Sequence, residues 1–217
     1  MGVAAERALG RAREGAPHGE LFSHREEGEL ELACVLRPQV GMGSLSGVPY
    51  VAALGACEGL EQLGVAGVGV GWPADVVRED GAGLVARVRT SAGYAEGMFV
   101  VCSLSFDVAG GAHADALPAD EQVADAVCGA ILARVDDWAA AVGAGRAVAG
   151  PLAPVLSDYF DRVTLMGKPV ELVYPNGRVA MRGTLAGVDV WGRATVRNEL
   201  GGEVEVSPEQ ASIRAAQ

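Results

Sequence analysis

The most constraining feature of this chain is one long amphipathic helix, predicted over residues 119–142. Apolar residues recur there at spacings of three and four, so they form a single stripe. Asp120 and Glu121 suit the positive end of the helix dipole, and Gly143 is typical of a helix end. A helix of this kind must bury its stripe against another layer. The stripe consists of Val123, Val127, Ile131, Val135, Trp138 and Val142.

Segments with strand character supply that second layer. In residues 29–37, polar and apolar side chains alternate at first and then give way to an apolar run, as in a strand that enters a sheet. Residues 84–90 and 98–106 are predicted to form an antiparallel hairpin. The helical spacing of apolar side chains predicts another helix that ends near Gly64. The pattern therefore predicts an α+β domain, with helices packed on a mixed or antiparallel sheet.

The sequence pattern changes after Leu165, where helical spacing of apolar residues gives way to short strand-like segments. Short strand-like segments separated by turn signals follow, among them Asn176-Gly177, which favours a tight hairpin turn. Such closely spaced short strands predict a small β-barrel. We therefore expect two domains, residues 1–165 and residues 166–217.

Composition limits the classes of function. A net charge of −11 over 217 residues argues against a nucleic-acid-binding surface. The chain has no run of about 18 apolar residues, so no membrane span is expected. The cysteines are widely spaced among apolar neighbours, which favours buried thiols in a reducing cytoplasm over a metal site or disulfides. These cysteines are Cys34, Cys57, Cys102 and Cys128.

Four segments, spread over nearly the whole chain, resemble the biotin–protein ligase family in the family's order. Residues 4–15, AAERALGRAREG, are similar to its A-D-E-Q-T-x-G-R-G-R-x-G loop. Residues 71–88 resemble a second stretch of the family. Within it, GWPADV at 71–76 is similar to the motif K-W-P-N-D followed by an apolar residue, and GAGLVAR at 81–87 matches the small residues of the family's apolar-(A/G)-G-I-L-x-E strand. Residues 103–108, SLSFDV, stand where the family has G-I-G-I-N-V. Residues 167–214 resemble its SH3-like C-terminal domain.

This resemblance implies a biotin/lipoate ligase-like domain followed by a small SH3-like β-barrel. It implies biotin and ATP with Mg²⁺ as ligands, and a biotin carrier domain of a carboxylase as partner. In the family the glycine–arginine loop closes over biotin and its adenylate, and guanidinium groups suit carboxylate and phosphate. The implied ligand-binding residues are Arg7, Gly10, Arg11, Arg13, Gly15, Trp72, Asp75, Ala82, Gly83 and Asp107.

The chain departs from the family at its central cationic residue. The motif lysine, which in the family contacts the biotin carboxylate and the adenylate phosphate, is Gly71 here, and the motif asparagine is Ala74. The family's second lysine is also missing, and the only lysine of the chain is Lys168. Losing one preorganised cationic group costs about 3–4 kcal/mol of transition-state stabilisation. No catalytic residue is therefore assigned.

Three hypotheses about function remain open. The first is a catalytically impaired ligase homologue with a ligand-binding or regulatory role. The second is an active biotin–protein ligase with rearranged cationic residues, with arginines such as Arg87 compensating in part. The third is a structural or interaction protein with an empty pocket. The sequence shows no match to the family's first strand and helix, and we expect that this element is lost, is supplied by another chain or is encoded upstream. If it is absent, an exposed sheet edge in its place would favour a homodimer.

Overall fold

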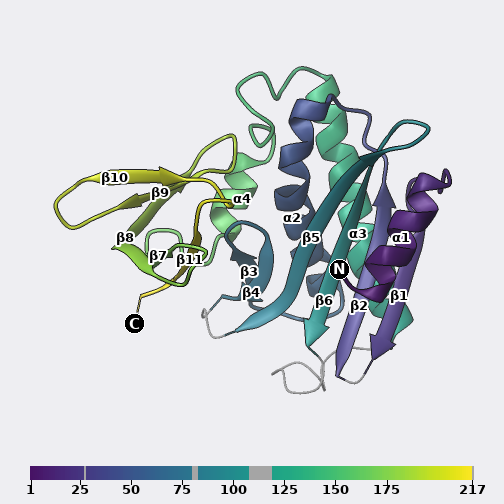
Figure 1. The fold of residues 1–217 in the computed structure, drawn as a ribbon, viewed down its shortest axis with the longest axis horizontal. Helices are drawn as coiled ribbons and strands as arrows, with labels where there is room; N and C mark the ends of the chain where they lie inside the picture. The colour runs from purple at the N-terminus through teal and green to yellow at the C-terminus, as the bar shows by residue number, and fades with distance from the viewer. Residues whose placement is uncertain (27, 80–82, 108–118, 217) are drawn as a thin grey trace.

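The chain folds into helices packed on antiparallel sheets (Figure 1). The computed structural model describes residues 1–26, 28–79, 83–107 and 119–216. The helices are α1 (Val3–Arg13), α2 (Val48–Gln62), α3 (Asp120–Gly143) and α4 (Leu156–Arg162), with a 3₁₀ helix, η1 (Met42–Gly47), before α2. The strands are β1 (Leu21–Glu26), β2 (Glu29–Leu36), β3 (Val68–Gly71), β4 (Asp75–Arg78), β5 (Leu84–Tyr94), β6 (Met98–Asp107), β7 (Pro169–Val173), β8 (Val179–Val188), β9 (Ala194–Arg197), β10 (Glu203–Val206) and β11 (Ser212–Ala215).

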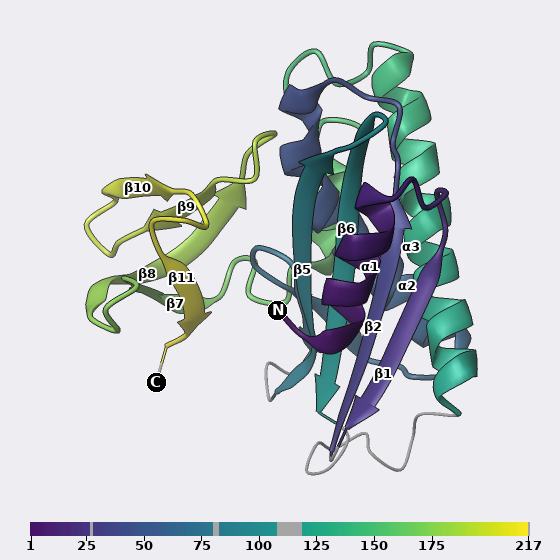
Figure 2. The ribbon, with the colours of Figure 1, turned by 45° about the vertical axis from the view of Figure 1, so that its right-hand side comes forward.

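The larger sheet has six strands in the order β1-β2-β6-β5-β4-β3, and all neighbours are antiparallel. Helices α2 and α3 cover one face, and α1 lies on the other (Figure 2). The predicted α+β domain with a packed sheet is thus confirmed. The hairpin of β5 and β6 is also confirmed, although its strands are longer than predicted and its turn falls at residues 95–97.

The main core lies between this sheet and the pair α2 and α3. Most of the predicted stripe of α3 is buried there, with Val142 partly buried. Two glycines of α2 allow the close approach, because an added Cβ at Gly55 would lie 2.6 Å from the Ile131 Cα. At Gly59 an added Cβ would lie 2.6 Å from the Val127 Cα.

The second sheet is C-terminal, with five strands in the order β10-β9-β8-β7-β11. Short strands after Leu165 were predicted and are confirmed. Helix α4 and the loop that follows it connect this sheet to the larger one (Figure 1). The SH3-like barrel and the domain boundary at residue 165 remain predictions.

All four cysteines are free and buried, as the sequence predicted. Three of them meet in the main core, where Cys34 of β2 lies opposite Cys102 of β6 and Cys128 comes from α3. Hydrogen bonding to the Cys102 and Cys128 thiols, together with burial, raises the pKa of Cys34 well above its usual value. No helix in the described part of the chain is long and apolar enough to cross a membrane.

Candidate ligand-binding face

Helix α1 is built from the segment that resembles the glycine–arginine loop. The expectation of a loop at residues 4–15 is wrong, because Val3–Arg13 is helical. Its alanines recur at helical spacing and bury one side of the helix against the sheet. Their floor consists of Ala33 and Val35 from β2 with Phe99 and Val101 from β6, an apolar cluster separate from the main core. The buried alanines of α1 are Ala4, Ala5, Ala8 and Ala12.

Glu31 of β2 holds the N-terminal end of α1. Its carboxylate accepts hydrogen bonds from the backbone N–H of Ala4 at 2.8 Å and of Ala5 at 3.2 Å. Gly2 lies against the same carboxylate, since an added Cβ there would be 2.4 Å from Glu31 Oε2. Glu31 is buried, so this contact satisfies both the charge and the unpaired N–H groups of the first helical turn.

Arg37, directly after β2, holds the opposite end. Its guanidinium donates to the carbonyl oxygen of Ala12 at 2.9 Å and to that of Ala16 at 2.8 Å. It also lies over the Phe99 ring, 5.8 Å from the ring centroid. A cation at the C-terminal end of a helix complements the helix dipole. Helix α1 is therefore docked through opposite charges at its two ends.

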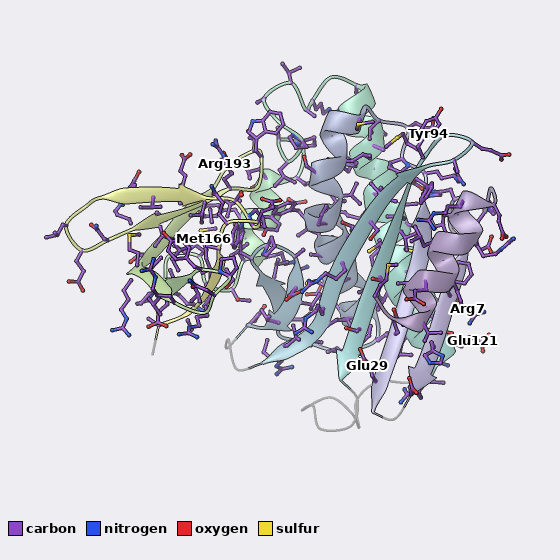
Figure 3. The ribbon with its side chains drawn as sticks, in the orientation of Figure 1. Arg7, Glu29, Tyr94, Glu121, Met166 and Arg193 are labelled. Atoms are coloured by element: carbon purple, nitrogen blue, oxygen red, sulfur yellow. The ribbon has the colours of Figure 1, made fainter. Side chains whose placement is uncertain are left out.

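Two arginines of α1, Arg7 and Arg11, lie at the β1 edge of the sheet. Arg7 lies 5.9 Å from the centroid of the Phe22 ring of β1, and Figure 3 shows it on that side of the molecule. Arg11 donates to Glu20, just before β1, at 3.1 Å and to Glu14 at 3.1 Å. Arg13 is exposed at the end of the helix. Gly10 lies in α1 and Gly15 directly after it, and a backbone contact of either with a ligand remains a prediction.

The segment Gly71 to Asp75 lies at the other edge, where β3 and β4 form a hairpin. Four strand spacings separate β1 from β4, which amounts to about 19 Å. Arg7 and Arg11 are therefore not brought together with the predicted tryptophan motif. At Gly71 an added Cβ would lie 2.9 Å from the Val77 Cγ1, so a lysine there would have to displace the valine.

Trp72 connects the two sheets. Its indole N–H donates to the carbonyl oxygen of Gly192 at 2.9 Å, and the Tyr50 hydroxyl donates to the same oxygen at 3.0 Å. The Trp72–Pro73 peptide is cis, and the Tyr159 hydroxyl donates to the Pro73 carbonyl at 2.6 Å. Trp72 is buried, and these bonds give it a role in joining the sheets. Its contact with a ligand remains a prediction.

A polar patch lies between α1 and the β3–β4 hairpin. Side chains alternate along strands, so the residues between the core-facing Ala86, Val88 and Leu104 point to the α1 side of the sheet. The register places Arg87 opposite Ser105 and Arg89 opposite Ser103. We call this set the polar sheet face: Asp75, Arg87, Arg89, Ser103 and Ser105.

Within the polar sheet face, Asp75 and Arg89 form an ion pair. Arg89 Nη1 lies 2.8 Å from Asp75 Oδ1, which also accepts from the Val88 N–H at 3.3 Å. Arg87 is exposed on the same strand. One row across the strands runs from Glu31 through Ser105 to Arg87, so this face adjoins the N-terminal end of α1.

The remaining predicted residues have less defined positions. Gly83 is exposed just before β5, and Ala82 lies outside the described residues. Asp107 ends β6 opposite Glu29, and its side chain lies outside the described part. Over the described ranges, no group of three or more His, Cys, Asp or Glu side chains is arranged to hold a metal ion.

Sequence reasoning missed Glu31, Arg37 and Arg89. The alternation Arg87-Val88-Arg89 is a local sign that both arginines share one face of a strand. Glu31 stands between the leucines Leu30 and Leu32 of β2, and a carboxylate in such a strand is a sign of a specific partner. Neither pattern names the partner.

Neither a protein-family model nor a curated protein matches the sequence. Solved structures do share its fold. A biotin protein ligase mutant from Aquifex aeolicus in complex with biotin has a TM-score of 0.72 at 16% identity, covering 100% of this chain and 96% of that chain. The ligase from the same organism in complex with biotin and ATP has a TM-score of 0.64 at 18% identity, covering 87% and 79%.

A biotin protein ligase-like protein of unknown function from Silicibacter sp. is also similar. Its TM-score is 0.70 at 19% identity, with 94% of this chain and 90% of that chain covered. At these identities the likeness establishes architecture. The chain has the biotin protein ligase fold, as the resemblance of its segments implied.

Proposed function

We propose that this chain is a non-catalytic protein of the biotin ligase fold that binds an anionic ligand, of the biotin or biotinyl-adenylate class, and has a regulatory role. The observation that carries the proposal is the distance between the arginines of α1 and the position of the missing motif lysine. Arg7 and Arg11 lie at the β1 edge, whereas Gly71 lies at the β3 edge. Adenylate formation requires cations that converge on one carboxylate and one triphosphate.

The polar sheet face supports the binding part of the proposal. Arg87 and Arg89 offer guanidinium groups on one strand, and Ser103 and Ser105 offer hydroxyls beside them. Guanidinium groups bind carboxylate and phosphate through paired hydrogen bonds. Arg89 is already paired with Asp75, so Arg87 is the group we assign to the ligand anion.

Calorimetric titration with biotin, and with a non-hydrolysable biotinyl-adenylate analogue, tests binding. We expect the analogue to bind, and Arg87→Gln to weaken it about tenfold through loss of a charge-assisted hydrogen bond. The matched control is Arg178→Gln in the turn between β7 and β8, where the guanidinium lies 5.5 Å from the centroid of the Tyr174 ring. Absence of binding at millimolar analogue would rule the proposal out.

Turnover is tested by biotin-dependent exchange of pyrophosphate into ATP and by self-labelling with biotin. Leaked biotinyl-adenylate labels nearby amines, and Lys168 is the only lysine, so any side-chain amide would form there. We expect no pyrophosphate exchange. We also expect the same amount of attached biotin on the unaltered chain and on the control Lys168→Arg, which has no lysine. Exchange, or transfer to a biotin carrier domain of a carboxylase, would favour the alternative of an active ligase with Mg²⁺ and ATP.

Introducing a lysine at position 71 tests whether the missing motif lysine alone accounts for the expected lack of catalytic activity. Gly71→Lys is combined with Val77→Ala, because the valine occupies the space beside Gly71. We expect the pair to remain inactive in pyrophosphate exchange, since Arg7 and Arg11 lie at the β1 edge, five strand spacings or about 24 Å from β3. Recovered exchange would show that position 71 alone decides activity.

One observation favours a second candidate, an interaction protein. A cleft of about 1110 Å³ lies between α4 and the C-terminal sheet. Phe160 and Leu200 line it, and Leu200 is 95% exposed. Cross-linking of the full chain in its native cell extract, compared with Leu200→Ser, tests this candidate. Loss of a cross-linked partner in the variant would support it, whereas an unchanged pattern would exclude this cleft.

A further inference from the structure

We propose that helix α1 is a removable cover over an apolar part of the ligand-binding face, and that Glu31 and Arg37 are the latch that keeps it closed. This inference rests on the proposed function, because the face that α1 covers continues into the polar sheet face. It concerns regulation of that site by this chain's own N-terminal segment.

The first step is the continuity of the two surfaces. On β6 the side chains on the α1 side are, in order, Phe99, Val101, Ser103 and Ser105. The first two lie under α1, and the last two belong to the polar sheet face. The Phe99 ring extends across Gly93 of β5, where an added Cβ would lie 2.4 Å from the ring. An apolar floor beside arginines suits a ligand with an apolar body and an anionic end.

The second step is that α1 is attached as a separate unit. Its apolar cluster is distinct from the main core, and the buried side chains of α1 are alanines, which bury little area each. The main core between the sheet, α2 and α3 does not include α1. Elements with small apolar contacts open locally at lower free energy than the core of a protein. Helix α1 can therefore leave the sheet while the remaining layers stay folded.

The third step is the latch. Glu31 and Arg37 bind backbone groups at opposite ends of α1, and both belong to the floor rather than to the helix. Weakening either residue removes a charge-assisted contact from the closed state alone. The open state then gains population by about 5- to 30-fold.

A reporter thiol measures opening directly. Ala8 is fully buried on the sheet side of α1, so Ala8→Cys reacts with a maleimide only when the helix leaves the sheet. The four native cysteines are buried in the main core and report global unfolding. Gly10→Cys is the exposed control, because an added Cβ there meets no atom within 4 Å. Hydrogen exchange of the α1 amides gives the same information without a new side chain.

We expect the thiol at position 8 to react faster than the native cysteines, and to accelerate about 5- to 30-fold with Glu31→Gln or Arg37→Met. The native cysteines should keep their rates. If position 8 reacts only as fast as the native cysteines, α1 is part of the global fold and the inference is overturned. The inference is equally overturned if the α1 amides exchange as slowly as those of α3.

Calorimetry with the biotinyl-adenylate analogue links opening to binding. We expect Arg37→Met to bind the analogue more tightly than the unaltered chain does. The gain in affinity should equal the factor by which the population of the open state increases. Equal affinity in both proteins would overturn the inference and leave the proposed function standing. Absence of binding in both, with fast reaction at position 8, would instead remove the proposed function and the regulatory role with it.

Discussion

Glu31 and Arg37 bind opposite ends of the same helix from one strand and its continuation. The carboxylate receives the backbone N–H groups of Ala4 and Ala5, and the guanidinium donates to the carbonyls of Ala12 and Ala16. Strand β2 thus places a negative group at the positive end of the helix dipole, and the residue directly after it places a positive group at the negative end. Two charges of opposite sign place α1 along the strand and fix its direction.

This arrangement predicts that Glu31→Gln and Arg37→Met are not additive. Each should reduce the free energy of unfolding by about 1–2 kcal/mol, because each removes charge-assisted hydrogen bonds to one helix end. Once one end is released, the other contact stabilises less, so the double variant should lose less than the sum. Urea unfolding of the unaltered chain, the two single variants and the double variant gives the four free energies of this double-mutant cycle. Strict additivity would show that the two ends act independently; Arg13→Met, on the exposed side of α1, is the control.

A second prediction concerns Gly192, whose carbonyl oxygen accepts hydrogen bonds from Trp72 and Tyr50. Its φ is +84°, and an added Cβ would lie 2.2 Å from the Tyr50 Cζ. Gly192→Ala should therefore combine backbone strain with a clash and destabilise the chain by about 3 kcal/mol or more. Urea unfolding followed by tryptophan fluorescence measures this loss.

Gly201→Ala separates the two causes. Gly201 has a φ of +81°, and an added Cβ there meets no atom within 4 Å. This control should cost only the strain of a left-handed conformation, about 1 kcal/mol. Equal losses at both glycines would mean that the Tyr50 ring moves away from position 192 without cost.

Local patterns predicted those parts of the fold that local patterns determine. The stripe of α3 and the alternation of β2 depend on residues close in sequence, and both were predicted. The contacts that define the candidate site are distant: Ala4 is 27 positions from Glu31, and Trp72 is 120 positions from Gly192. No local pattern carries such pairings.

Helix α1 shows why one local prediction was wrong. Alanine is a strong helix former but a weak apolar signal, so the spacing of Ala4, Ala8 and Ala12 did not stand out beside the glycines and arginines. The glycine–arginine resemblance favoured a loop. The floor under the alanines decides the outcome, because it buries their methyl groups.

A third prediction concerns the helix pair α2 and α3. Replacing glycine by alanine within a helix ordinarily stabilises it by about 0.5–1 kcal/mol. Gly59→Ala should instead destabilise by about 1–3 kcal/mol, because its Cβ would lie 2.6 Å from the Val127 backbone. Gly129→Ala in α3 is the matched control, with no atom within 4 Å of the added Cβ, and should stabilise. The melting temperatures of both variants test this prediction. A higher melting temperature for Gly59→Ala would mean that α2 and α3 can move apart without cost.

The last prediction concerns pH and Glu171 in the C-terminal sheet. Its carboxylate accepts from Arg214 at 2.7 Å and 2.8 Å and from Arg182 at 2.9 Å, along one row of β11, β7 and β8. Hydrogen bonding to Arg214, then to Arg182, holds the pKa of Glu171 below its usual 4.5. A carboxyl whose pKa is lower in the folded state stabilises the fold above its unfolded-state pKa.

That stability should be lost as pH falls from about 4.5 through the lower pKa of the folded state. In Glu171→Gln this part of the pH dependence should disappear, so the melting temperatures of the two proteins should converge in acid and separate above pH 4.5. Glu203→Gln on β10 of the same sheet, where Glu203 pairs with Arg197 at 2.7 Å between exposed side chains, is the control and should leave the profile nearly unchanged. Parallel melting profiles of Glu171→Gln and the unaltered chain across this range would show that the arginines do not stabilise the charged form of Glu171.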